Sequence, residues 1–457
     1  MEEALDPGAA LSFVTPLGYT TSVNCGYCGG KGPGKSYSYY ASGVSLTPEF
    51  YQSLLDHSWR RSGSLLYRPN PRDSCCPHYS IRLDTDLFAP TKDQRQTVNR
   101  FNRHILGEKY IKEAARLYPR SREEAKKRDN TFDLVERIHE AEAAYLKPAL
   151  EPSHKLTVEL EDDSFTEEKY AVFENYQLKV HKEKPGDVSR RGFTRFLCTS
   201  PIEKRTETLA SGQTRKLGSY HQCYRIDGKL VAIGVVDLLP DSVSSVYFLY
   251  HESIHKFAPG KLGALREIAL AKELGYKWWY PGFYIHGCPK MRYKIDYMPQ
   301  SILDPETLVW EPLDSRVLGI LDKPYYMGIS AALQAGLSSE EHDVDIPMAG
   351  APSSNEQSMD SAADTPSMSD EDEDEDTDLF SKKMPGIPSL QAMMEVNLDN
   401  IPLRIPGIPR LHRTSDLVVW DTVQLDSGPS IKLVVAELVA ALGVDLLGRF
   451  GIDFSRR

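Results

Sequence analysis

The sequence predicts an α+β protein, in which a mixed sheet flanked by helices follows a small Cys-rich N-terminal domain and precedes a partly disordered acidic C-terminal region. Three observations support this fold class: paired cysteines near the start, a strand, strand, helix, strand order in the middle, and an acidic tract late in the chain. A length of 457 residues allows two or three folded domains. We expect a Cys-rich and helical domain, a sheet domain, a disordered acidic linker and a C-terminal extension, at 1–155, 156–330, 331–384 and 385–457.

The cysteine pairs predict a metal centre. "CGYCGG" places Cys25 and Cys28 in CxxC spacing, and "DSCCPHYS" places Cys75 and Cys76 side by side before a proline. Zinc and iron-sulfur centres both need several thiolates that converge on one point. We therefore expect these four cysteines to bind zinc or an iron-sulfur cluster, and the sequence does not decide between them. Two alternatives remain: a fourth ligand from His78 in place of a buried cysteine, or redox thiols without metal.

Residues 91–150 are predicted to be helical, because "KDQRQTVNRFNRHILG" and "NTFDLVERIHEAEAAYLK" repeat apolar residues near every 3.6 positions. The basic segment "PRSREEAKKR" separates them. Such a charge run is usually the solvated face of a helix. Contact with a polyanion stays an alternative, because the same half of the chain holds the paired cysteines.

Residues 220–310 carry the clearest alternation of strands and helix. "KLVAIGVVDLLP" and "VSSVYFLY" are rich in β-branched and aromatic residues and predict a β-hairpin. "APGKLGALREIALAKELG" has glycines at its start and Gly275 at its end, which predicts a helix, and "KWWYPGFYI" returns as a strand. This order resembles the core of the GNAT acetyltransferase superfamily, in which the helix N-terminus holds a cofactor pyrophosphate through backbone amides.

The net charge of −11 comes from one segment. The stretch from Glu340 to Asp378 contains fifteen acidic residues and no Lys or Arg, which leaves 54 basic against 50 acidic residues in the rest of the chain. The region 331–384 is also rich in Ser, Ala, Pro and Met and has little to bury, so it is predicted to be disordered. The mildly positive remainder can hold a polyanion or can simply be soluble.

The C-terminal extension contains a predicted helix. "SIKLVVAELVAALGVDLLGRF" has helical apolar spacing and needs a groove, so we expect the extension to pack back on the protein or to bind a partner. Glu437 and Asp445 make it unsuitable as a membrane span, and the first residues lack the regions of a secretory signal. We expect no membrane partner and a reducing, cytoplasmic location, with the nucleus as a second location.

Two stretches resemble one known family. "NCGYCGGKG", "YQSLLDHSWRRSG" and "CCPHYSIRL" are similar, in this order, to the N-terminal domain of arginyl-tRNA-protein transferases. "RRGFTRFLCTSPI", "HQCYRIDGKLVAIGVVDLLP" and "YIHGCPKMRYK" are similar to the catalytic domain of the same family. The likeness covers residues 12–87 and 165–312, whereas the chain from 331 onward resembles only the extensions of fungal members in a general way.

The resemblance implies a GNAT-like catalytic domain that transfers arginine from arginyl-tRNA, its co-substrate, to the α-amino group of proteins beginning with Asp, Glu or oxidised Cys. This modification marks those proteins for the ubiquitin-ligase pathway and degradation. An aminoacyl ester is already activated, so attack by an amine needs no ATP and no covalent enzyme intermediate. Placement of the two substrates is then the main task, and we expect a monomer to perform it.

Site residues are expected mainly in the similar motifs. Candidates for catalytic contacts are His221, Gln222, Asp237 and Tyr247. Because Arg pairs with carboxylates and aromatic residues can line a channel for the terminal adenosine, candidates for substrate binding are Arg195, Arg266, Tyr284, Tyr293 and Lys294. Phosphate contacts to the tRNA are expected from Arg60, Arg61, Lys290 and Arg292. Each has a structural alternative: a core histidine, a turn cap, a packed aromatic or a solvated cation.

Two other functions remain open from the sequence. An acetyl-CoA-dependent N-acetyltransferase of the GNAT type would use the same helix N-terminus and would bind coenzyme A. A non-catalytic metal-thiolate module that binds RNA or protein would tolerate changes at Gln222 and Asp237.

Overall fold

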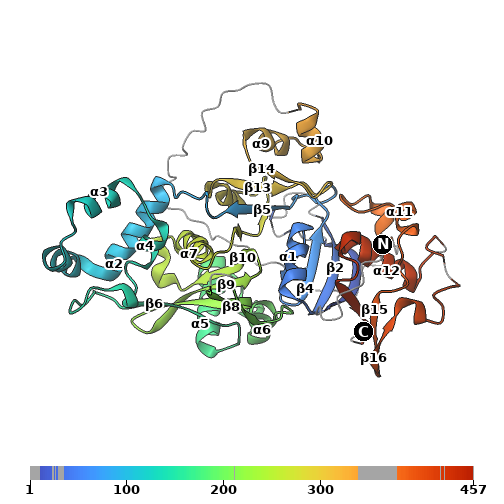
Figure 1. The fold of residues 1–457 in the computed structure, drawn as a ribbon, viewed down its shortest axis with the longest axis horizontal. Helices are drawn as coiled ribbons and strands as arrows, with labels where there is room; N and C mark the ends of the chain where they lie inside the picture. The colour runs from blue at the N-terminus through green and yellow to red at the C-terminus, as the bar shows by residue number, and fades with distance from the viewer. Residues whose placement is uncertain are drawn as a thin grey trace.

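The computed structural model describes residues 11–455 except 23, 24, 26, 29–34, 210, 211, 338–377, 423 and 427. These residues form two sheets with helices packed against them, so the predicted α+β class is confirmed (Figure 1). Figure 1 shows a block of helices at one end of the molecule and the C-terminal extension at the other, with the two sheets between them.

The first sheet joins segments from both ends of the described chain. Its strand order is β16-β15-β17-β1-β2-β4-β3. The bounds are Ser12–Ser22 (β1), Ser36–Ser45 (β2), Arg60–Ser62 (β3), Leu65–Pro69 (β4), Pro402–Ile405 (β15), Ile408–Arg413 (β16) and Phe450–Asp453 (β17). Ser12 is the register partner of Phe450, so β1 and β17 pair in parallel across the whole length of the chain.

The second sheet contains the predicted hairpin. Its order is β14-β13-β5-β11-β10-β9-β8-β6, with β12 paired to β5 and β7 paired to β8. The bounds are Tyr79–Asp84 (β5), Leu156–Asp162 (β6), Arg205–Thr208 (β7), Thr214–Ile226 (β8), Lys229–Leu238 (β9), Ser242–Tyr250 (β10), Trp278–Tyr280 (β11), Phe283–Tyr284 (β12), Gln300–Leu303 (β13) and Trp310–Pro312 (β14). Strand pairing crosses the boundaries at 155 and 384, since β5 lies in this sheet and β15 in the first, and the four-domain division stays a prediction.

Helices cover both sheets. Those of the predicted helical region are α2 (Lys92–Leu117), α3 (Arg122–Asn130) and α4 (Leu134–His139), which confirms that prediction. The others are α1 (Pro48–Asp56), α5 (Glu167–Asn175), α6 (Arg190–Leu197), α7 (Pro259–Glu273), α8 (Pro289–Arg292), α9 (Ser315–Leu321), α10 (Ile329–Gln334), α11 (Leu390–Met394) and α12 (Ile431–Leu442). Helix α5 continues into a π-helical turn, Tyr176–His181, which brings His181 under β10 through a contact with Tyr247.

The strand, strand, helix, strand prediction is confirmed in detail. β9 and β10 pair antiparallel with a register shift between Ser245 and Tyr247, and β11 pairs in parallel with β10 after the α7 crossover. Helix α7 approaches β10 closely at Gly263, where a Cβ atom would lie 2.3 Å from the Phe248 ring. The helix ends before Gly275, whose φ of +72° suits a residue that follows a helix. Close packing therefore accounts for one of the glycines at the start of α7.

The helical block is joined to α7 by a charged cluster. His139 contacts Glu142 at 2.6 Å through Nδ1 and Glu273 at 2.5 Å through Nε2. Arg266 on α7 pairs with Glu142 and donates to the carbonyl of Ile138 at 2.6 Å. Because α4 with the turn after it, and α7 opposite, each contribute a cation and a carboxylate to a mostly buried interface, the cluster fixes the helical block against the second sheet.

The C-terminal extension packs back on the first sheet. This was one of the two expectations for it, the other being that it binds a partner. The indole N–H of Trp59 and the guanidinium of Arg68 donate to the carbonyl of Ala441 at 2.9 and 2.8 Å. Leu438 and Ile452 are fully buried in the same hydrophobic cluster as the α1 side chains. The extension is therefore part of the N-terminal core.

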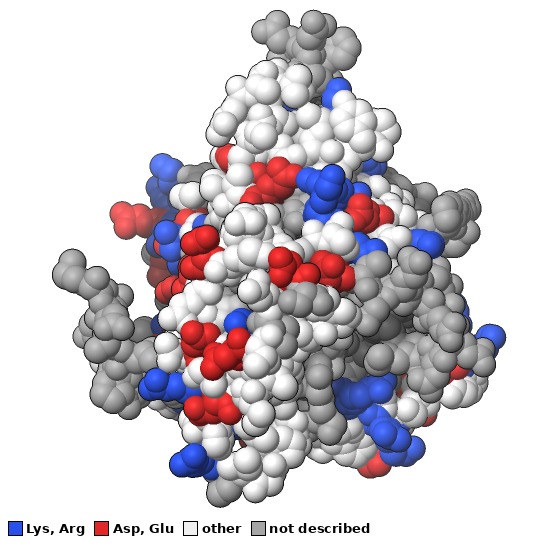
Figure 2. Space-filling model, turned by 90° about the vertical axis from the view of Figure 1, so that its right-hand side faces the viewer, with Lys and Arg blue, Asp and Glu red and all other residues white. Residues whose placement is uncertain are grey.

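The acidic tract from 338 to 377 lies outside the described residues, so its predicted disorder stays a prediction. On the face shown in Figure 2, acidic and basic side chains of the described residues are interspersed and do not gather by sign. Within the part of the chain that the structure describes, none of the helices combines the length and apolarity that a membrane span needs.

Leu438→Ala should destabilise the protein by about 2 to 5 kcal/mol, because it removes a fully buried side chain from the core that the extension shares with α1. Val418→Ala is the matched control: Val418 is 97% exposed in the same extension and should change the free energy of unfolding by less than about 0.5 kcal/mol. Urea denaturation measures both. Equal midpoints for Leu438→Ala and the parent protein would contradict the shared core.

The His139 cluster predicts a loss of stability at alkaline pH. Burial opposes protonation of His139, but its bonds to Glu142 and Glu273 outweigh burial and raise its pKa from 6.5 to about 9. A raised folded-state pKa stabilises the protein fully below about pH 6.5, and this contribution is lost as the pH rises through about 9. His139→Gln should flatten the free energy of unfolding over that window. Parallel pH curves for the two proteins would contradict this account.

Candidate active site and metal centre

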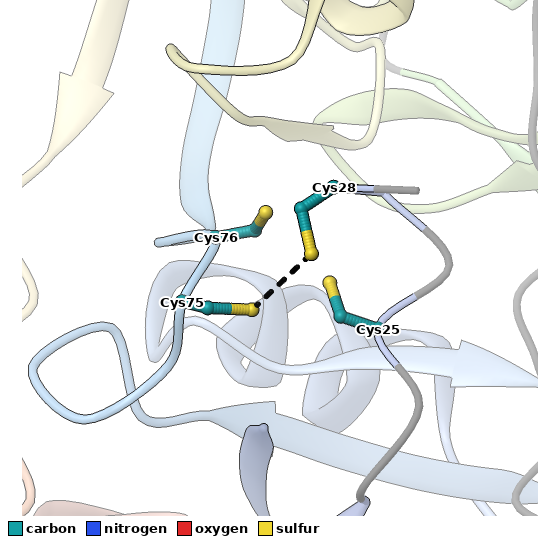
Figure 3. Close-up of side chains that lie close together, drawn as sticks. All are labelled: Cys25, Cys28, Cys75 and Cys76. Atoms are coloured by element: carbon teal, nitrogen blue, oxygen red, sulfur yellow. Dashed lines mark hydrogen bonds between the residues drawn. The ribbon is translucent and has the colours of Figure 1, made fainter. Parts of the chain in front are cut away.

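The four predicted cysteines converge on one point (Figure 3). Their sulfur atoms all lie within 4.8 Å of one another, and the Sγ atoms of Cys28 and Cys75 are 3.8 Å apart. Cys25 and Cys28 follow β1, whereas Cys75 and Cys76 lie between β4 and β5. A tetrahedral ion with metal-sulfur bonds of about 2.3 Å would hold its sulfurs about 3.8 Å apart. The arrangement therefore fits a metal site built from four thiolates.

The electrostatics of the thiols also favour a cation. Burial opposes ionisation of Cys25, but hydrogen bonds from the Tyr27 and Cys28 backbone outweigh it and lower its pKa. Burial, with hydrogen bonding and repulsion from Cys25, raises the pKa of Cys75 to about 12. The same causes raise the pKa of Cys76. Four thiolates can coexist here only when a cation offsets their charge.

His78 packs beside the cysteines and is not needed as a ligand. Its ring makes edge contacts with Tyr27 at 5.0 Å and with Phe283 at 5.4 Å between centroids. Burial lowers its pKa to about 4, so the ring is neutral. Because Tyr27 and Phe283 also line the pocket described next, these aromatic contacts connect the four-cysteine cluster to the pocket wall.

A pocket lies where the two sheets meet. The first sheet and α1 contribute Tyr51, Arg60, Arg61 and Tyr67. The second sheet, α7 and the segment after β12 contribute Ser244–Phe248, Tyr250, Gly260, Glu267, Trp279, Met291, Tyr293 and Lys294. The pocket thus combines fixed cations, a carboxylate and tyrosine hydroxyls with aromatic walls. It includes the N-terminus of α7 and part of "KMRYK", two of the predicted site segments.

Arg60 is a buried cation with free hydrogen-bonding capacity. Arg60 is 5% exposed, and its Nη1 donates a hydrogen bond to the carbonyl of Trp59 at 2.9 Å. Its Nε and Nη2 have no hydrogen-bond partner among the described residues. The rings of Tyr280 and Phe283 lie 5.4 and 5.2 Å from the guanidinium carbon. Unpaired buried N–H groups are costly, so this guanidinium is poised for an anionic ligand.

Arg61 is held by Asp237. Its Nε and Nη2 donate to the two carboxylate oxygens at 2.8 and 2.6 Å, and Ser219 donates to the same carboxylate at 2.6 Å. Asp237 is completely buried and does not line the pocket, so it positions Arg61 rather than meeting a substrate. Burial of Arg60 and Arg61 also argues against the predicted contact with tRNA phosphates, which pass over the surface.

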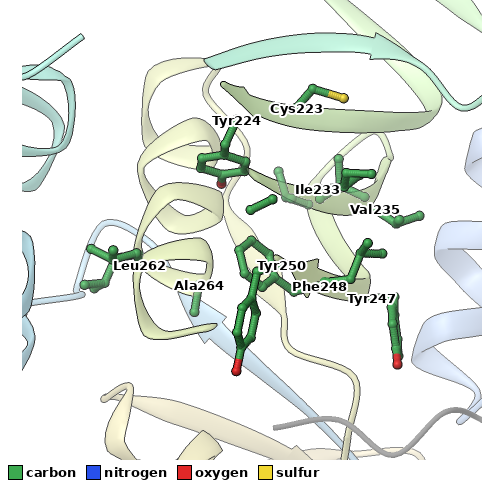
Figure 4. Close-up of a cluster of buried hydrophobic side chains, with 14 of the residues drawn as sticks. Cys223, Tyr224, Ile233, Val235, Tyr247, Phe248, Tyr250, Leu262 and Ala264 are labelled. Carbon is green, nitrogen blue, oxygen red and sulfur yellow. The ribbon is translucent and has the colours of Figure 1, made fainter. Parts of the chain in front are cut away.

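Tyr247 lies at the pocket beside a histidine that the sequence did not single out. Its hydroxyl is 3.4 Å from Nε2 of His181, and burial together with Lys290 lowers the pKa of His181 to about 4. Figure 4 shows the Tyr247 and Tyr250 side chains extending to the same side, away from the cluster that holds Ile233 and Val235. At cellular pH this imidazole is neutral, so its unprotonated nitrogen can accept a hydrogen bond from the Tyr247 hydroxyl.

Three predicted site residues lie in the core instead. His221 is fully buried, its Nε2 contacts the Leu197 carbonyl at 2.9 Å, and burial lowers its pKa to about 4. Gln222 accepts a hydrogen bond from Tyr224 at 2.6 Å. Arg266 faces α4 through its pair with Glu142. None of the three lines the pocket, so the structure gives them packing and positioning contacts.

The remaining candidates divide between the pocket and its surroundings. Tyr293 and Lys294 line the pocket, and Lys294 donates to the Phe283 carbonyl at 2.9 Å. Tyr284 is buried and its hydroxyl contacts His286 at 2.7 Å outside the pocket. Arg195, Lys290 and Arg292 are exposed and do not line it.

Glu267 is the pocket residue that sequence reasoning missed. It follows Arg266, which was chosen for its charge, but a step of one residue turns a helix by about 100° and so changes the face. The available signal was a carboxylate within the most apolar part of α7, where Leu265, Ile268 and Ala269 are fully buried.

A pocket with fixed charges at the junction of two sheets, next to four converging cysteines, is typical of an enzyme that brings two substrates together. Comparison with known proteins is more specific. Residues 23–96 match the family model "Arginine-tRNA-protein transferase, N terminus", and residues 168–304 match "Arginine-tRNA-protein transferase, C terminus". Both segments are therefore similar to arginyl-tRNA-protein transferases, as the resemblance predicted.

Similar proteins come from several kingdoms. Arginyl-tRNA-protein transferase 1 of Saccharomyces cerevisiae is 33% identical over 54% of this chain, which spans 47% of the yeast protein and fits the expected fungal likeness. The Drosophila melanogaster transferase is 27% identical, with 70% of this chain and 86% of the relative covered. An aspartate/glutamate leucyltransferase of Pseudomonas savastanoi is 25% identical over 56% of this chain and 80% of its own length. The solved structure of L-PGS from Bacillus licheniformis covers 50% of this chain at 13% identity, with a TM-score of 0.25 that defines no shared fold.

Replacing Cys25 or Cys76 by Ser should abolish metal binding, because each removes one of four converging thiolates. Cys198→Ser is the matched control, since Cys198 is a half-buried free thiol outside the cluster. Elemental analysis of the purified proteins should find the metal of the parent in the control and background metal in the other two. Unchanged metal content in Cys25→Ser would exclude this centre.

Proposed function

We propose that this protein transfers arginine from arginyl-tRNA to the α-amino group of proteins that begin with an acidic residue. The observation that carries the proposal is the guanidinium of Arg60, buried in the pocket with Nε and Nη2 unpaired among the described residues. The likeness to arginyl-tRNA-protein transferases indicates the donor, and the pocket supplies a site for the acidic side chain. Oxidised Cys would suit the same site, because it is also an anion.

In this reaction the main task of the protein is to position its two substrates. The α-amino nitrogen attacks the ester carbonyl of the aminoacyl-tRNA, a C–N bond forms, the C–O bond to the ribose breaks, and the ribose oxygen takes a proton. An α-amino group with a pKa near 7.7 to 8 is partly neutral at cellular pH, so no strong base is required. Tyr247 and the neutral His181 can relay the proton that the amine loses. No nucleophilic side chain and no ATP are needed.

The acidic first residue of the acceptor explains the unpaired nitrogens of Arg60. A carboxylate can accept from Nε and Nη2 together, which is the two-bond geometry that Arg favours. The aromatic rings of Tyr280 and Phe283 exclude water from this contact and strengthen it. A neutral first residue would leave the guanidinium buried and unpaired, which is unfavourable. The site therefore discriminates against neutral residues as well as binding acidic ones.

The second sheet with α7 is proposed to be a GNAT-like catalytic domain. The antiparallel β8-β9-β10 meander, the register shift in β10, and the parallel β10-α7-β11 unit support this assignment. Gly260 places the first turn of α7 at the pocket, where backbone amides could meet the phosphate of the terminal nucleotide. The same feature suits coenzyme A, which is why the acetyltransferase alternative must be tested directly.

The tRNA is proposed to contact the exposed cations near the pocket. Lys290 and Arg292 lie on α8 directly before the pocket residues Tyr293 and Lys294, so phosphates of the acceptor end could reach them. Arg60 and Arg61 are buried and line the pocket, so we place them there and not among the tRNA contacts. Binding should weaken steeply with added salt, as expected for phosphate contacts.

The metal is proposed to be a single zinc ion. All four sulfurs lie within 4.8 Å, which suits one tetrahedral ion, whereas a multi-iron cluster places thiolates on different iron atoms and spreads them further apart. Bound zinc would supply structural rigidity to the turn that carries Tyr27. An iron-sulfur cluster would instead show visible charge-transfer absorption in protein purified without oxygen.

The proposal extends to the location, oligomeric state and downstream partner of the protein. Free thiols at all seven cysteines suit a reducing compartment, and we propose a cytoplasmic or nuclear location. Action as a monomer and delivery of the arginylated products to a ubiquitin ligase belong to the same proposal.

The proposal is tested by supplying labelled arginine, tRNA and arginyl-tRNA synthetase to a peptide that starts with Asp and to its twin that starts with Ala. Label should enter the Asp peptide alone, and ribonuclease should abolish the transfer. Label in both peptides alike, or in neither, would overturn the assignment. Acetyl transfer from acetyl-CoA that survives ribonuclease would support the GNAT acetyltransferase instead.

Arg60→Met should lower kcat/KM for the Asp peptide by about 10- to 100-fold, because it removes a charge-assisted contact of about 1.5 to 3 kcal/mol and keeps an apolar stem of similar length. Arg195→Met is the matched control, since Arg195 is exposed on α6 and should have little effect. Steady-state kinetics on correctly folded proteins, checked by thermal melting, decide between them. Equal losses in both variants would remove Arg60 from the acceptor site.

A further inference from the structure

Two tyrosine hydroxyls lie at the same pocket as the Arg60 guanidinium. Tyr67 is the register partner of Arg60 in the antiparallel β3-β4 pair, so the two side chains project from the same face of the first sheet. Tyr51 on α1 is 1% exposed and lines the pocket with them. Among the described residues, neither hydroxyl takes part in a hydrogen bond.

Both hydroxyls keep their protons at cellular pH. Burial raises the pKa of Tyr67 to about 12, although Arg60 opposes this effect, and burial also raises the pKa of Tyr51. A protonated phenol can donate one hydrogen bond, and a buried donor without an acceptor is unfavourable. Nε and Nη2 of Arg60 are also unpaired among the described residues, so the pocket holds four donor groups that lack an acceptor.

The charges on this wall favour an anion as the ligand of these donors. Arg61 is neutralised by its pair with Asp237, whereas Arg60 has no ion-pair partner in the part of the chain that the structure describes. Lys294 donates to the carbonyl of Phe283 at 2.9 Å, and the ring of Phe283 lies against Arg60, so a second cation is close by. An anion that enters here therefore meets positive charge as well as hydrogen-bond donors.

The number of oxygens on the anion decides which donors it can use. A carboxylate has two oxygens in one plane, which Nε and Nη2 of Arg60 can bind together. A sulfonate has three oxygens arranged as a pyramid, so a guanidinium that binds two of them leaves the third out of its plane. That third oxygen needs a donor of its own, because a buried acceptor without a hydrogen bond is unfavourable. The hydroxyls of Tyr67 and Tyr51 are suited to supply it, since both line the pocket beside Arg60.

We propose that Tyr51 and Tyr67 donate hydrogen bonds to the third oxygen of a sulfonate on the first residue of the acceptor. They thereby raise the preference of the site for fully oxidised Cys over Asp. This inference rests on the proposed function, in which Arg60 binds the acidic side chain of the acceptor. The two hydroxyls take part in no bond change, so they are specificity-determining groups. A sulfinate, which has two oxygens, gains nothing from them and should be treated like a carboxylate.

Peptides that differ only in their first residue test this role. Arginyl-tRNA is the common donor, and the acceptors begin with Asp, with cysteic acid, which carries a sulfonate, or with cysteine sulfinic acid. Tyr67→Phe and Tyr51→Phe should each lower kcat/KM for the cysteic acid peptide by about 10-fold more than for the Asp peptide, because each removes a donor to a buried anion. The sulfinic acid peptide should follow the Asp peptide, since it lacks a third oxygen. A change confined to one variant would assign the role to that tyrosine alone.

Tyr145→Phe is the matched control, because it removes the same hydroxyl from a side chain that is 59% exposed and outside the pocket, and it should leave the ratio between acceptors unchanged. A purely structural role for the two pocket tyrosines would lower transfer to all three peptides by the same factor. That result, or unchanged kinetics in both variants, would overturn the inference. Thermal melting checks folding, and Tyr67→Phe decides alone if Tyr51→Phe does not fold. Failure of the proposed function gives a different result, since the parent protein would then transfer arginine to none of the peptides.

Discussion

The buried pair between Arg61 and Asp237 is the interaction on which the pocket depends. Arg61 belongs to β3 of the first sheet and Asp237 to β9 of the second, and their side chains are 2% and 0% exposed. Two charges removed from water cost several kcal/mol unless their geometry is nearly ideal, and here two guanidinium bonds and one hydroxyl bond satisfy the carboxylate. Such a pair tolerates one relative position of the two sheets, and that position defines the pocket walls.

The pocket is organised by charge more than by shape. Arg60 and Glu267 are both buried and come from different layers, and aromatic rings surround each of them. In a medium of low polarity, fixed charges discriminate strongly between ligands of opposite sign. The buried guanidinium of Arg60 can therefore discriminate between acceptors without a large contact area, since a wrong acceptor would leave its Nε and Nη2 unmatched.

The sequence predicted local features well and side-chain direction poorly. CxxC spacing and the Cys75–Cys76 doublet predicted that four thiols converge on one point, because ligand sets leave a recognisable pattern. Periodicity predicted the β9-β10 hairpin and α7. The face of β8 from which the His221 side chain projects could not be predicted from the sequence. Neighbouring residues on a strand alternate between faces, and both faces of β8 are buried. Arg266 and Glu267 differ by one step on α7, and only packing shows which of them meets the pocket. Long-range pairing of β17 with β1 leaves no local signal at all.

The position of β17 has a consequence during synthesis. Residues 12 and 450 are register partners, so this edge of β1 stays open until residue 450 has left the ribosome. At roughly 5 to 20 residues per second, the nascent chain carries an unpaired strand beside an incomplete apolar core for on the order of tens of seconds. Exposed strand edges attract other chains, so the newly made N-terminal region should require protection by chaperones until its last partner strand emerges.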